Sequence, residues 1–366
     1  MSYHPSIFIV YFLIVQLVVI NLKVSHISCT CVNEKDIFVT SIFKQGELNM
    51  LKKLISASLI FMAILFCFVA CDDSSSSKKP SFDAKSTPLT LENYGDTDMT
   101  VTVSITGFSL EEVKLKYSID NEDAIEITET DSLIIVGAGK KISFYGDRTK
   151  NSSASTKYFT IDCSTDCYIY GNVMSLITST DFATNKSLEG HDYAFLNLFL
   201  DNYNIKNHES KKLVLPATKL SALCYSQMFY GCVGLTKAPE LPATNLSFFC
   251  YKGMFSNCTG LVSAPSLPAN ELFAGCYQNM FTGCSALTEA PELPARRLAI
   301  HCYASMFQGC TNLASVTCHA TTTDTEATKS WLQYVSPDGT FTKAQDASFW
   351  ETGENGIPTA WTIKTM

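Results

Sequence analysis

Apolar and polar positions return with a period of 26 residues between positions 215 and 310. Within each copy, apolar residues fall four positions apart and are followed by Gly or Asn, as at Leu246, Cys250 and Met254. A spacing of three or four places such residues on one face of a helix. Gly and Asn readily adopt the left-handed conformation that often ends a helix. The pattern therefore predicts a short helix with a left-handed cap in every copy.

A short segment with apolar ends lies between successive predicted helices. In residues 235–238 it predicts a strand with Leu235 and Ala238 inward. Pro239 lacks the amide proton that a strand ladder requires, and Pro242 suits the first position of a helix. A period of about 20 to 50 residues is typical of stacked repeats that bury their apolar faces against one another. We therefore expect a mixed α/β fold, a solenoid of 26-residue units built of strand, turn, short helix and cap.

Each copy carries the anchor motif Cys-Tyr-x-x-Met-Phe-x-Gly-Cys, with Asn in place of Gly in one copy. The four anchors span residues 224–232, 250–258, 276–284 and 302–310. Their cysteines could form disulfides, bind zinc or serve as apolar packing residues. Zinc-binding cysteines usually lie about two to four residues apart, whereas these lie eight apart. Free cysteine is among the most buried residue types, so packing is favoured, and no metal site or cofactor is expected.

The residues ahead of the repeats alternate between apolar and polar positions in short runs separated by turn residues. The expected strands are 99–105, 113–117, 124–128, 133–136, 141–145 and 167–170. Strands at this spacing predict a small β-sandwich-like domain over residues 87–178. We interpret it as a spacer, because no aromatic cluster or metal-ligand set marks a site. Cys163 and Cys167 are near enough in sequence to bridge across a turn, and a free pair is an equal alternative.

An apolar stretch near the start of the chain, at residues 54–70, has the features of an export signal. It follows Met50, Lys52 and Lys53 and ends directly before Cys71. A basic start, an apolar core and a cleavage region in this order are typical of a signal peptide. The segment resembles a lipoprotein signal, which implies that Cys71 is cleaved free and lipidated. A transmembrane helix is the weaker alternative, because the stretch is short and its flanks are charged.

Residues 1–49 contain a further apolar stretch, which has no evident use ahead of a complete signal. We expect them to be an extension from a translation start assigned too early, with residues 50–70 as the signal peptide. Asp72, Asp73 and four serines follow, and they predict a solvated tether over residues 71–86. The acidic pair resembles the surface-export signal of Bacteroides-type lipoproteins, which implies a protein of the outer membrane that is exposed on the cell surface.

The composition narrows the classes of function. The chain has 366 residues, of which 46% are apolar and 17% charged, as is typical of globular proteins. Without residues 1–70, 22 basic residues stand against 32 acidic ones. This balance argues against nucleic acid as a partner, since phosphate binding requires a basic surface. The sequence also lacks the GxSxG, HExxH, P-loop and Rossmann motifs, so we expect no enzyme activity.

The repeat resembles the BspA-like leucine-rich repeat family, in the variant with Ala-Pro-Glu-Leu-Pro-Ala and Cys-Tyr-x-x-Met-Phe-x-Gly-Cys-x-x-Leu units. The matching residues are 238–243 with 250–261, and 290–295 with 302–313. Residues 144–146 and 170–177 are similar to segments that precede the repeats in such proteins, and residues 339–343 and 356–361 to their C-terminal cap.

The resemblance covers about residues 87–366 and places the solenoid at 190–318 and a C-terminal cap at 319–366. It implies a surface protein, often an adhesin that binds host matrix proteins or other cells. It implies no catalytic residues.

The positions that the repeat leaves free supply the candidate binding residues. Polar residues beside each predicted strand would line the face on which stacked repeats usually bind partners. They are Thr236, Lys237, Glu240, Ser263, Ser266, Thr288, Glu289 and Glu292. Solubility alone would also select polar residues here, so both interpretations stay open.

The anchor tyrosines form a second candidate set, consisting of Tyr225, Tyr251, Tyr277 and Tyr303. They would form an exposed aromatic strip for carbohydrate, or they pack between neighbouring repeats, which we favour. The sequence thus predicts a lipid-anchored cell-surface protein that binds protein or mediates cell adhesion and contacts the membrane through its lipid alone. The alternative is a surface lipoprotein that captures glycans for a nutrient-uptake system.

Overall fold

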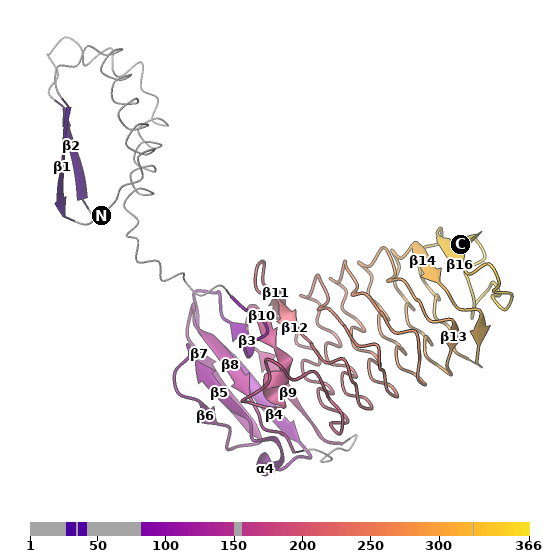
Figure 1. Ribbon diagram of the computed structural model, residues 1–366, viewed down its shortest axis with the longest axis horizontal. Helices are drawn as coiled ribbons and strands as arrows, with labels where there is room; N and C mark the ends of the chain where they lie inside the picture. Colours follow the sequence, from indigo (N-terminus) through magenta and orange to yellow (C-terminus); the bar gives the residue numbers. More distant parts are fainter. Residues whose placement is uncertain (1–26, 34–35, 42–81, 150–155, 325) are drawn as a thin grey trace, which may run out of the picture. The chain divides into compact units, whose positions relative to one another are not determined.

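The computed structural model describes residues 27–33, 36–41, 82–149, 156–324 and 326–366 (Figure 1). The chain divides into two compact parts, Met1–Pro80 and Ser81–Met366. In the first part, β1 (Ile27–Asn33) pairs antiparallel with β2 (Asp36–Ser41). The expected signal peptide at 50–70, the expected lipidation residue Cys71 and most of the expected tether lie outside the described residues. No helix within the described ranges is long and apolar enough to cross a membrane.

The second part begins with two β-sheets. One has three strands in the order β7 (Asp131–Val136), β4 (Met99–Thr106) and β9 (Tyr158–Cys163). The other has the order β11-β10-β3-β8-β5-β6, and β12 also pairs with β10. Its strands are β11 (Ile205–Asn207), β10 (Cys167–Asn172), β3 (Leu89–Glu92), β8 (Lys141–Tyr145), β5 (Lys116–Ile119), β6 (Ile125–Glu126) and β12 (Leu213–Val214).

Alternating burial explains why these segments form strands. Along β4, Met99, Val101 and Val103 are fully buried, while the residues between them are partly exposed. The expected strand at 141–145 matches β8, whereas β3 and β9 were not predicted. The expected strand at 113–117 covers the end of the short helix α4 (Leu110–Val113) and the start of β5. A 3₁₀ helix, η1 (Val173–Leu176), follows β10.

The repeats continue directly from this sheet, because β11 and β12 pair parallel with β10 (Figure 1). At the far end of the repeats, β13 (Arg297–Leu298) pairs with β15 (Thr322–Thr323). A parallel sheet of β14 (Ser315–Cys318), β16 (Thr340–Lys343) and β17 (Thr362–Thr365) follows. One hydrophobic cluster runs through the two sheets, the repeats and this end.

The structure contradicts the expected fold class, a mixed α/β solenoid of leucine-rich repeats behind a β-sandwich-like domain. Among the described residues, α4 is the one α-helix, and it lies outside the repeats. The strand expected in each copy is reduced between neighbouring copies to single bridges such as Lys237 to Ser263 and Glu289 to Ser315. The strands belong to several small sheets, and no continuous solenoid sheet runs through the described repeats.

Each anchor forms a run of turns instead of a helix. These turn runs span residues 223–231, 249–257, 275–283 and 301–309, and each has a left-handed residue at its first, fifth and ninth position. In the second run these residues are Phe249 (φ 53°), Gly253 (φ 61°) and Asn257 (φ 59°). An α-helix requires φ near about −63° at every residue. The left-handed conformation predicted for Asn257 is thus confirmed, but it ends a turn and not a helix.

The backbone hydrogen bonds of a turn run alternate between two kinds of partner. The amide of Tyr251 donates to the carbonyl of Cys276 in the next copy (3.0 Å), whereas the amide of Met254 donates to Tyr251 within its own copy (3.2 Å). The same alternation occurs in the other turn runs. Stacking therefore satisfies amides that an α-helix would satisfy internally. A lone copy would leave every second amide of the run without a protein partner.

Aromatic rings stack along the interior of the repeats. Phe255 lies between Phe229 and Phe281, with ring centroids 5.6 and 5.8 Å away and interplanar angles of 2° and 6°. The anchor tyrosines form a parallel column, which Trp331 extends at 6.4 Å from Tyr303. All these rings are at most 1% exposed. The four-residue spacing therefore marks residues that point inward from a run of turns. The prediction of a helix from this spacing was wrong.

Candidate functional site

The candidate residues beside the predicted strands lie on the surface. All eight are exposed, and we call them the strand row: Thr236, Lys237, Glu240, Ser263, Ser266, Thr288, Glu289 and Glu292. The bridge between Lys237 and Ser263 joins successive copies within this row. Glu292 contacts the His319 ring at 2.5 Å, and Glu240 pairs with Lys212 at 3.4 Å. The structure thus places the row on neighbouring copies of the stack.

Asn207 ties the strand row to the sheet. Its Oδ1 accepts hydrogen bonds from the backbone amides of Thr236 (2.9 Å) and Lys237 (3.0 Å). Its Nδ2 donates to the carbonyl of Lys237 at 2.9 Å. Because Asn207 ends β11, these bonds replace a strand ladder at the first complete copy. Both the amide and the carbonyl of Lys237 are therefore hydrogen-bonded to the side chain of Asn207.

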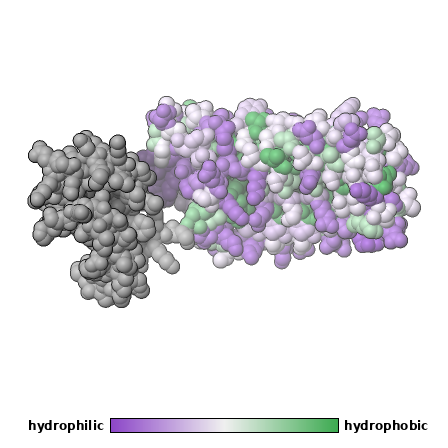
Figure 2. Space-filling model, turned by 90° about the horizontal axis from the view of Figure 1, so that it is seen from above, coloured by the Kyte–Doolittle hydropathy of each residue, from purple (hydrophilic) through white to green (hydrophobic). Residues whose placement is uncertain are grey.

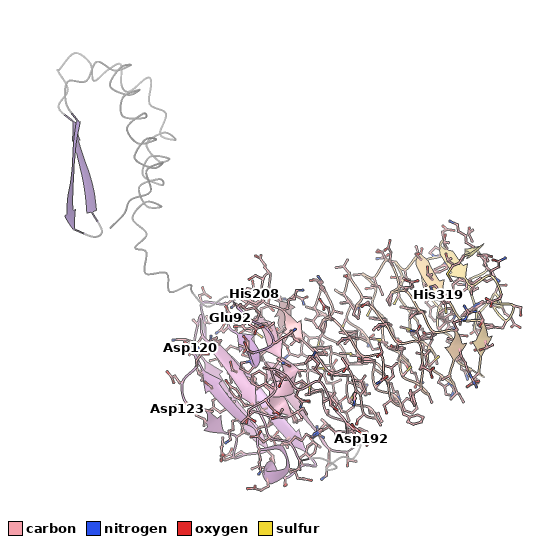
Figure 3. All side chains as sticks on the ribbon, in the orientation of Figure 1. Glu92, Asp120, Asp123, Asp192, His208 and His319 are labelled. Atoms are coloured by element: carbon pink, nitrogen blue, oxygen red, sulfur yellow. The ribbon has the colours of Figure 1, made fainter. Side chains whose placement is uncertain are left out.

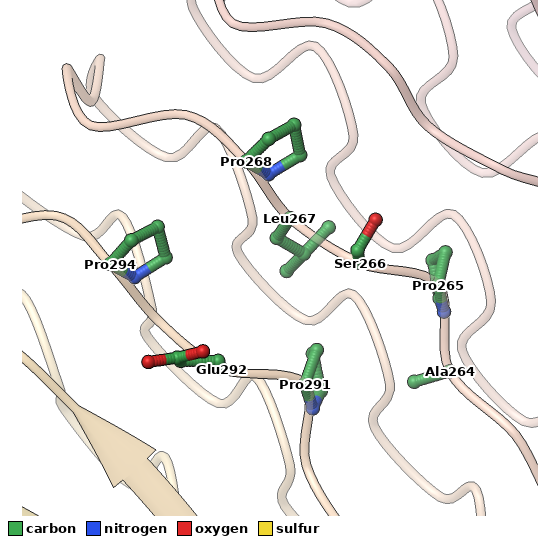
Figure 4. A pocket seen from close by; sticks show the side chains of 8 residues that line it. All are labelled: Ala264, Pro265, Ser266, Leu267, Pro268, Pro291, Glu292 and Pro294. Atoms are coloured by element: carbon green, nitrogen blue, oxygen red, sulfur yellow. The ribbon is translucent and has the colours of Figure 1, made fainter.

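A groove of about 400 Å³ opens within the strand row, between the segments that follow the second and third anchors (Figure 4). Two proline-flanked segments, 264–268 and 290–294, supply its walls. Ser266 and Glu292 of the strand row line it together with Leu267. In Figure 4 the two segments run side by side, with a proline near each end of both. The groove is thus mostly apolar, with two polar side chains.

Proline explains why these segments stay apart. No hydrogen bond joins 264–268 to 290–294, both of which are described in full. Proline carries no amide proton, so a segment with two prolines can contribute little to a ladder. One copy later, where Thr317 and Ala320 replace the prolines, the amide of Leu293 donates to the Thr317 carbonyl at 3.1 Å and the amide of His319 donates to the Leu293 carbonyl at 3.0 Å. The ladder closes where proline is absent.

The second candidate set does not form a surface strip. Tyr225, Tyr251, Tyr277 and Tyr303 are at most 1% exposed and stack on one another inside the repeats. The expected exposed aromatic strip for carbohydrate is therefore wrong for these residues. The packing interpretation, which the sequence analysis favoured, agrees with their burial.

A different group of aromatic residues, which the sequence analysis missed, lies at the sheet end of the repeats. Tyr94 stacks on Tyr168 with ring centroids 4.2 Å apart and planes 28° apart, and Tyr168 contacts His208 edge-on at 4.9 Å. We call these three residues the aromatic platform. Tyr94 is 43% exposed. Tyr168 lies on β10, and His208 directly follows β11, which pairs with β10.

Charged residues surround the aromatic platform. Asp166 accepts a hydrogen bond from the Tyr94 hydroxyl at 3.4 Å and pairs with Lys206 at 3.0 Å. Glu92 forms an ion pair with Lys211, whose Nζ also lies 4.5 Å from the ring centroid of Tyr170. Figure 3 shows Glu92 and His208 together at this end of the stack, with His319 at the other end. Asp166 and Glu92 are thus each paired with a lysine.

The ionisation states at the platform follow from these contacts. Burial acts to raise the pKa of Glu92, but hydrogen bonds from Lys211 and Tyr170 outweigh it and leave this pKa below its ordinary value. Burial is the main cause of the lowered pKa of His208, with a smaller effect from the charge of Lys211. His208 is therefore neutral at pH 7 and Glu92 is charged.

Sequence alone could show only part of this group. Tyr168 and Tyr170 alternate within a strand that was predicted, and this pattern marks one face of the strand. Tyr94 and His208 lie about 70 residues before and 40 residues after it. The pairing of β3 with β10, and of β10 with β11, brings all of them together. That pairing was not predicted, because β3 and β11 were not identified.

The anchor cysteines are packing residues in the structure. They are free thiols, fully buried, and the Sγ atoms of Cys232, Cys258, Cys284 and Cys310 each donate to a phenylalanine carbonyl of the preceding copy at 3.0 Å. Burial raises the pKa of Cys258 to about 12. A thiol that stays protonated and buried is a poor nucleophile. Cys302, although beside His301 in sequence, has its pKa raised by burial to about 12 as well.

Cys163 ends β9 and Cys167 begins β10, and their sulfur atoms are 3.1 Å apart across the turn as free thiols. Within the described ranges, no group of three or more His, Cys, Asp or Glu residues could hold a metal ion. The surface of the second part in this view is mainly hydrophilic, with scattered apolar residues (Figure 2).

Searches with the chain found no matching family model, no matching curated protein and no matching solved structure.

Proposed function

We propose that this chain is a non-enzymatic, lipid-anchored protein of the outer membrane that binds a protein partner on other cells or their matrix through the strand row. The groove between Ser266 and Glu292 is the observation that carries this proposal. Exposed polar residues alone would be explained by solubility. A proline-walled groove in the middle of such residues has no part in solubility, and it offers a place for a side chain of a partner.

The stack suits presentation of a binding surface. Hydrogen bonds between copies and continuous ring columns hold each copy against the next, so the strand row changes little in shape when a partner binds. At a strand spacing of about 4.8 Å, the three copies that carry the strand row have a combined width of roughly 15 Å. This width suits one protein loop better than a large globular face. Single contacts would be weak, and many anchored copies would strengthen them.

The polar residues of the row favour a partner with charges of both signs. Lys237 and Glu289 are exposed, and no ion pair is present for either one within the described ranges. Glu292 borders the groove and contacts His319. A partner loop could therefore bring a carboxylate to Lys237 and a basic group to Glu289. Complementary charges of this kind contribute mainly to specificity and to the association rate.

Binding of the full-length protein on beads to fibronectin, laminin, collagen, mucin and whole epithelial cells tests the proposal. The double variant Lys237→Ala/Glu289→Ala removes one charge of each sign from the strand row. The control Lys219→Ala/Glu271→Ala removes the same charges from exposed positions outside the row, where Lys219 bridges to Asn245. We expect the first variant to lose at least about tenfold in affinity, a loss typical of central contacts, and the control to match the wild type. Equal binding by both variants, or no binding by the wild type, would refute the proposal.

The alternative of glycan capture loses its original basis, because the anchor tyrosines are buried. Resemblance to BspA-like surface proteins supports the adhesive role. The anchoring at Cys71 is part of the proposal, and metabolic labelling with an alkyne fatty acid tests it: a Cys71→Ser protein should take up no label.

A further inference from the structure

We propose that the aromatic platform of Tyr94, Tyr168 and His208 binds an uncharged saccharide ring. None of the three residues belongs to the strand row, so this site stands independently of the adhesive role. The sheet that carries the platform was interpreted from sequence as a spacer. The platform gives it a binding function of its own.

Tyr94 supplies the exposed part of the platform. The Tyr168 ring covers one face of Tyr94 at 4.2 Å, so the exposed 43% of Tyr94 comes from its other face and its edge. Exposure of a large apolar ring to water is unfavourable, and a tyrosine held in this way often marks a contact site. The stack with Tyr168 also fixes the orientation of the ring. A flat ligand face therefore meets a ring that is already in place.

His208 offers one hydrogen-bond donor in a known position. The backbone amides of Ser210 (3.1 Å) and Lys211 (3.2 Å) both donate to its Nδ1, which must therefore be the unprotonated nitrogen. The lowered pKa of His208 agrees with a neutral ring. The proton thus lies on Nε2, for which the described part of the chain shows no acceptor. A hydroxyl group of a ligand could accept from this Nε2.

The two ion pairs beside the platform favour an uncharged ligand. Asp166 is paired with Lys206, and Glu92 with Lys211, so the charges of these two pairs cancel, while Glu209 beside His208 has no ion pair within the described ranges. A ligand cation would find Asp166 and Glu92 already paired, and Lys211 already covers the ring of Tyr170. A ligand anion would find each lysine occupied. Asp166 and Lys206 are about half and one-third exposed, so they remain able to exchange hydrogen bonds with neutral hydroxyls.

A saccharide ring combines the two features that this arrangement requires. One face of a pyranose consists of C–H groups, which pack on the face of an aromatic ring, and its edge carries hydroxyls that both donate and accept. Tyr94 would hold the C–H face, while Asp166, Lys206 and His208 would contact the hydroxyls. Because the platform is open to solvent, a single ring binds weakly, and a polysaccharide that meets many anchored copies binds more tightly.

Affinity electrophoresis of the full-length protein tests the site with soluble neutral polysaccharides in the gel: glycogen, hydroxyethylcellulose, xylan and galactomannan. We expect at least one of them to retard the wild type. Tyr94→Ala should lower the affinity about tenfold, because it removes the stacking face. Tyr94→Phe keeps this face and should stay within about threefold of the wild type. Tyr334→Ala removes an exposed tyrosine that lies outside the platform and should have no effect.

Several outcomes would overturn the proposal. Retardation of the wild type by none of the four polysaccharides would do so, as would equal retardation of Tyr94→Ala and the wild type. Retardation only in polygalacturonate would show a charged ligand instead. If a proline-rich peptide binds, measured by fluorescence anisotropy, and Tyr94→Ala abolishes this while no polysaccharide binds, the platform is a peptide site. Loss of retardation in Lys237→Ala/Glu289→Ala but not in Tyr94→Ala would place saccharide binding on the strand row.

Discussion

Gly253 occupies the central left-handed position of the second turn run, and its replacement by alanine distinguishes a turn from a helix. Its φ is 61°, and the equivalent residues of the other copies, Gln227, Asn279 and Ser305, have φ of 52°, 58° and 52°. In an α-helix the change Gly→Ala stabilises by about 1 kcal/mol. At a left-handed position the same change introduces a side chain that clashes with the backbone, so the two structures predict effects of opposite sign.

The magnitude follows from the local geometry. A non-glycine residue in the left-handed region costs about 1 to 2 kcal/mol. The restriction of the unfolded chain returns about 0.4 to 1 kcal/mol of this. A Cβ at position 253 would lie 3.2 Å from Cγ of Gln227, a flexible side chain that can move, so it adds little further cost. We expect Gly253→Ala to destabilise the protein by about 1 kcal/mol.

Urea unfolding followed by circular dichroism measures this effect, with the midpoint compared at unchanged slope. Ser305→Gly is the reciprocal change at the equivalent position, and we expect it to be neutral or to stabilise by up to about 1 kcal/mol. In a helix it would destabilise. A rise in stability for Gly253→Ala together with a loss for Ser305→Gly would refute the turn structure.

Three further predictions concern the core and the platform. Phe255→Ala should destabilise the protein by about 3 to 5 kcal/mol. A double-mutant cycle with Phe281→Ala should show a coupling energy of about 0.5 to 1.5 kcal/mol, because the two rings stack at 5.8 Å. Strictly additive effects of the two substitutions in urea unfolding would contradict the stacked column of rings. Burial raises the pKa of Cys258 to about 12, so iodoacetamide at pH 8 should alkylate it only in urea, and mass spectrometry that finds it alkylated in the native protein would disprove this. The pKa of Glu92 is lowered in the folded protein, so the stability it contributes is complete above its unfolded pKa and is lost as the pH falls through the folded pKa. Glu92→Gln should therefore lose less stability than the wild type between about pH 5 and pH 3, and parallel acid unfolding curves would contradict the ion pair with Lys211.

The sequence analysis identified the repeat and its inward residues but assigned the wrong local structure. Leu246, Cys250 and Met254 do point inward, as their spacing predicts. The spacing of four does not distinguish a helix from a run of four-residue turns, because both bring every fourth residue to the same side. The decisive residues are those with positive φ, and among them Phe249 and Gln227 have no sequence preference for that conformation. Hydrogen bonds between copies enforce it, and a single copy of the sequence does not contain them.

The candidate site was predicted only where it depends on a single copy. Thr236 and Glu289 were expected on the surface because they stand beside inward apolar residues, and both are exposed. The aromatic platform was missed because it is assembled from three strands or strand ends far apart in sequence. Pro239 was interpreted as the end of a strand. The groove beside the equivalent residues Pro265 and Pro291 was missed, because it forms only when two copies stack.

The most direct test of the strand row is site-specific photo-crosslinking to the matrix protein, mucin or cell-surface protein that binds in the bead assay. A benzoylphenylalanine at Ser266 would lie in the groove, and one at Glu271 would lie on an exposed position outside the row. We predict that the protein labelled at position 266 crosslinks to the bound partner and that the protein labelled at position 271 does not. Crosslinking from position 271 alone, or from neither position while binding is intact, would contradict the account.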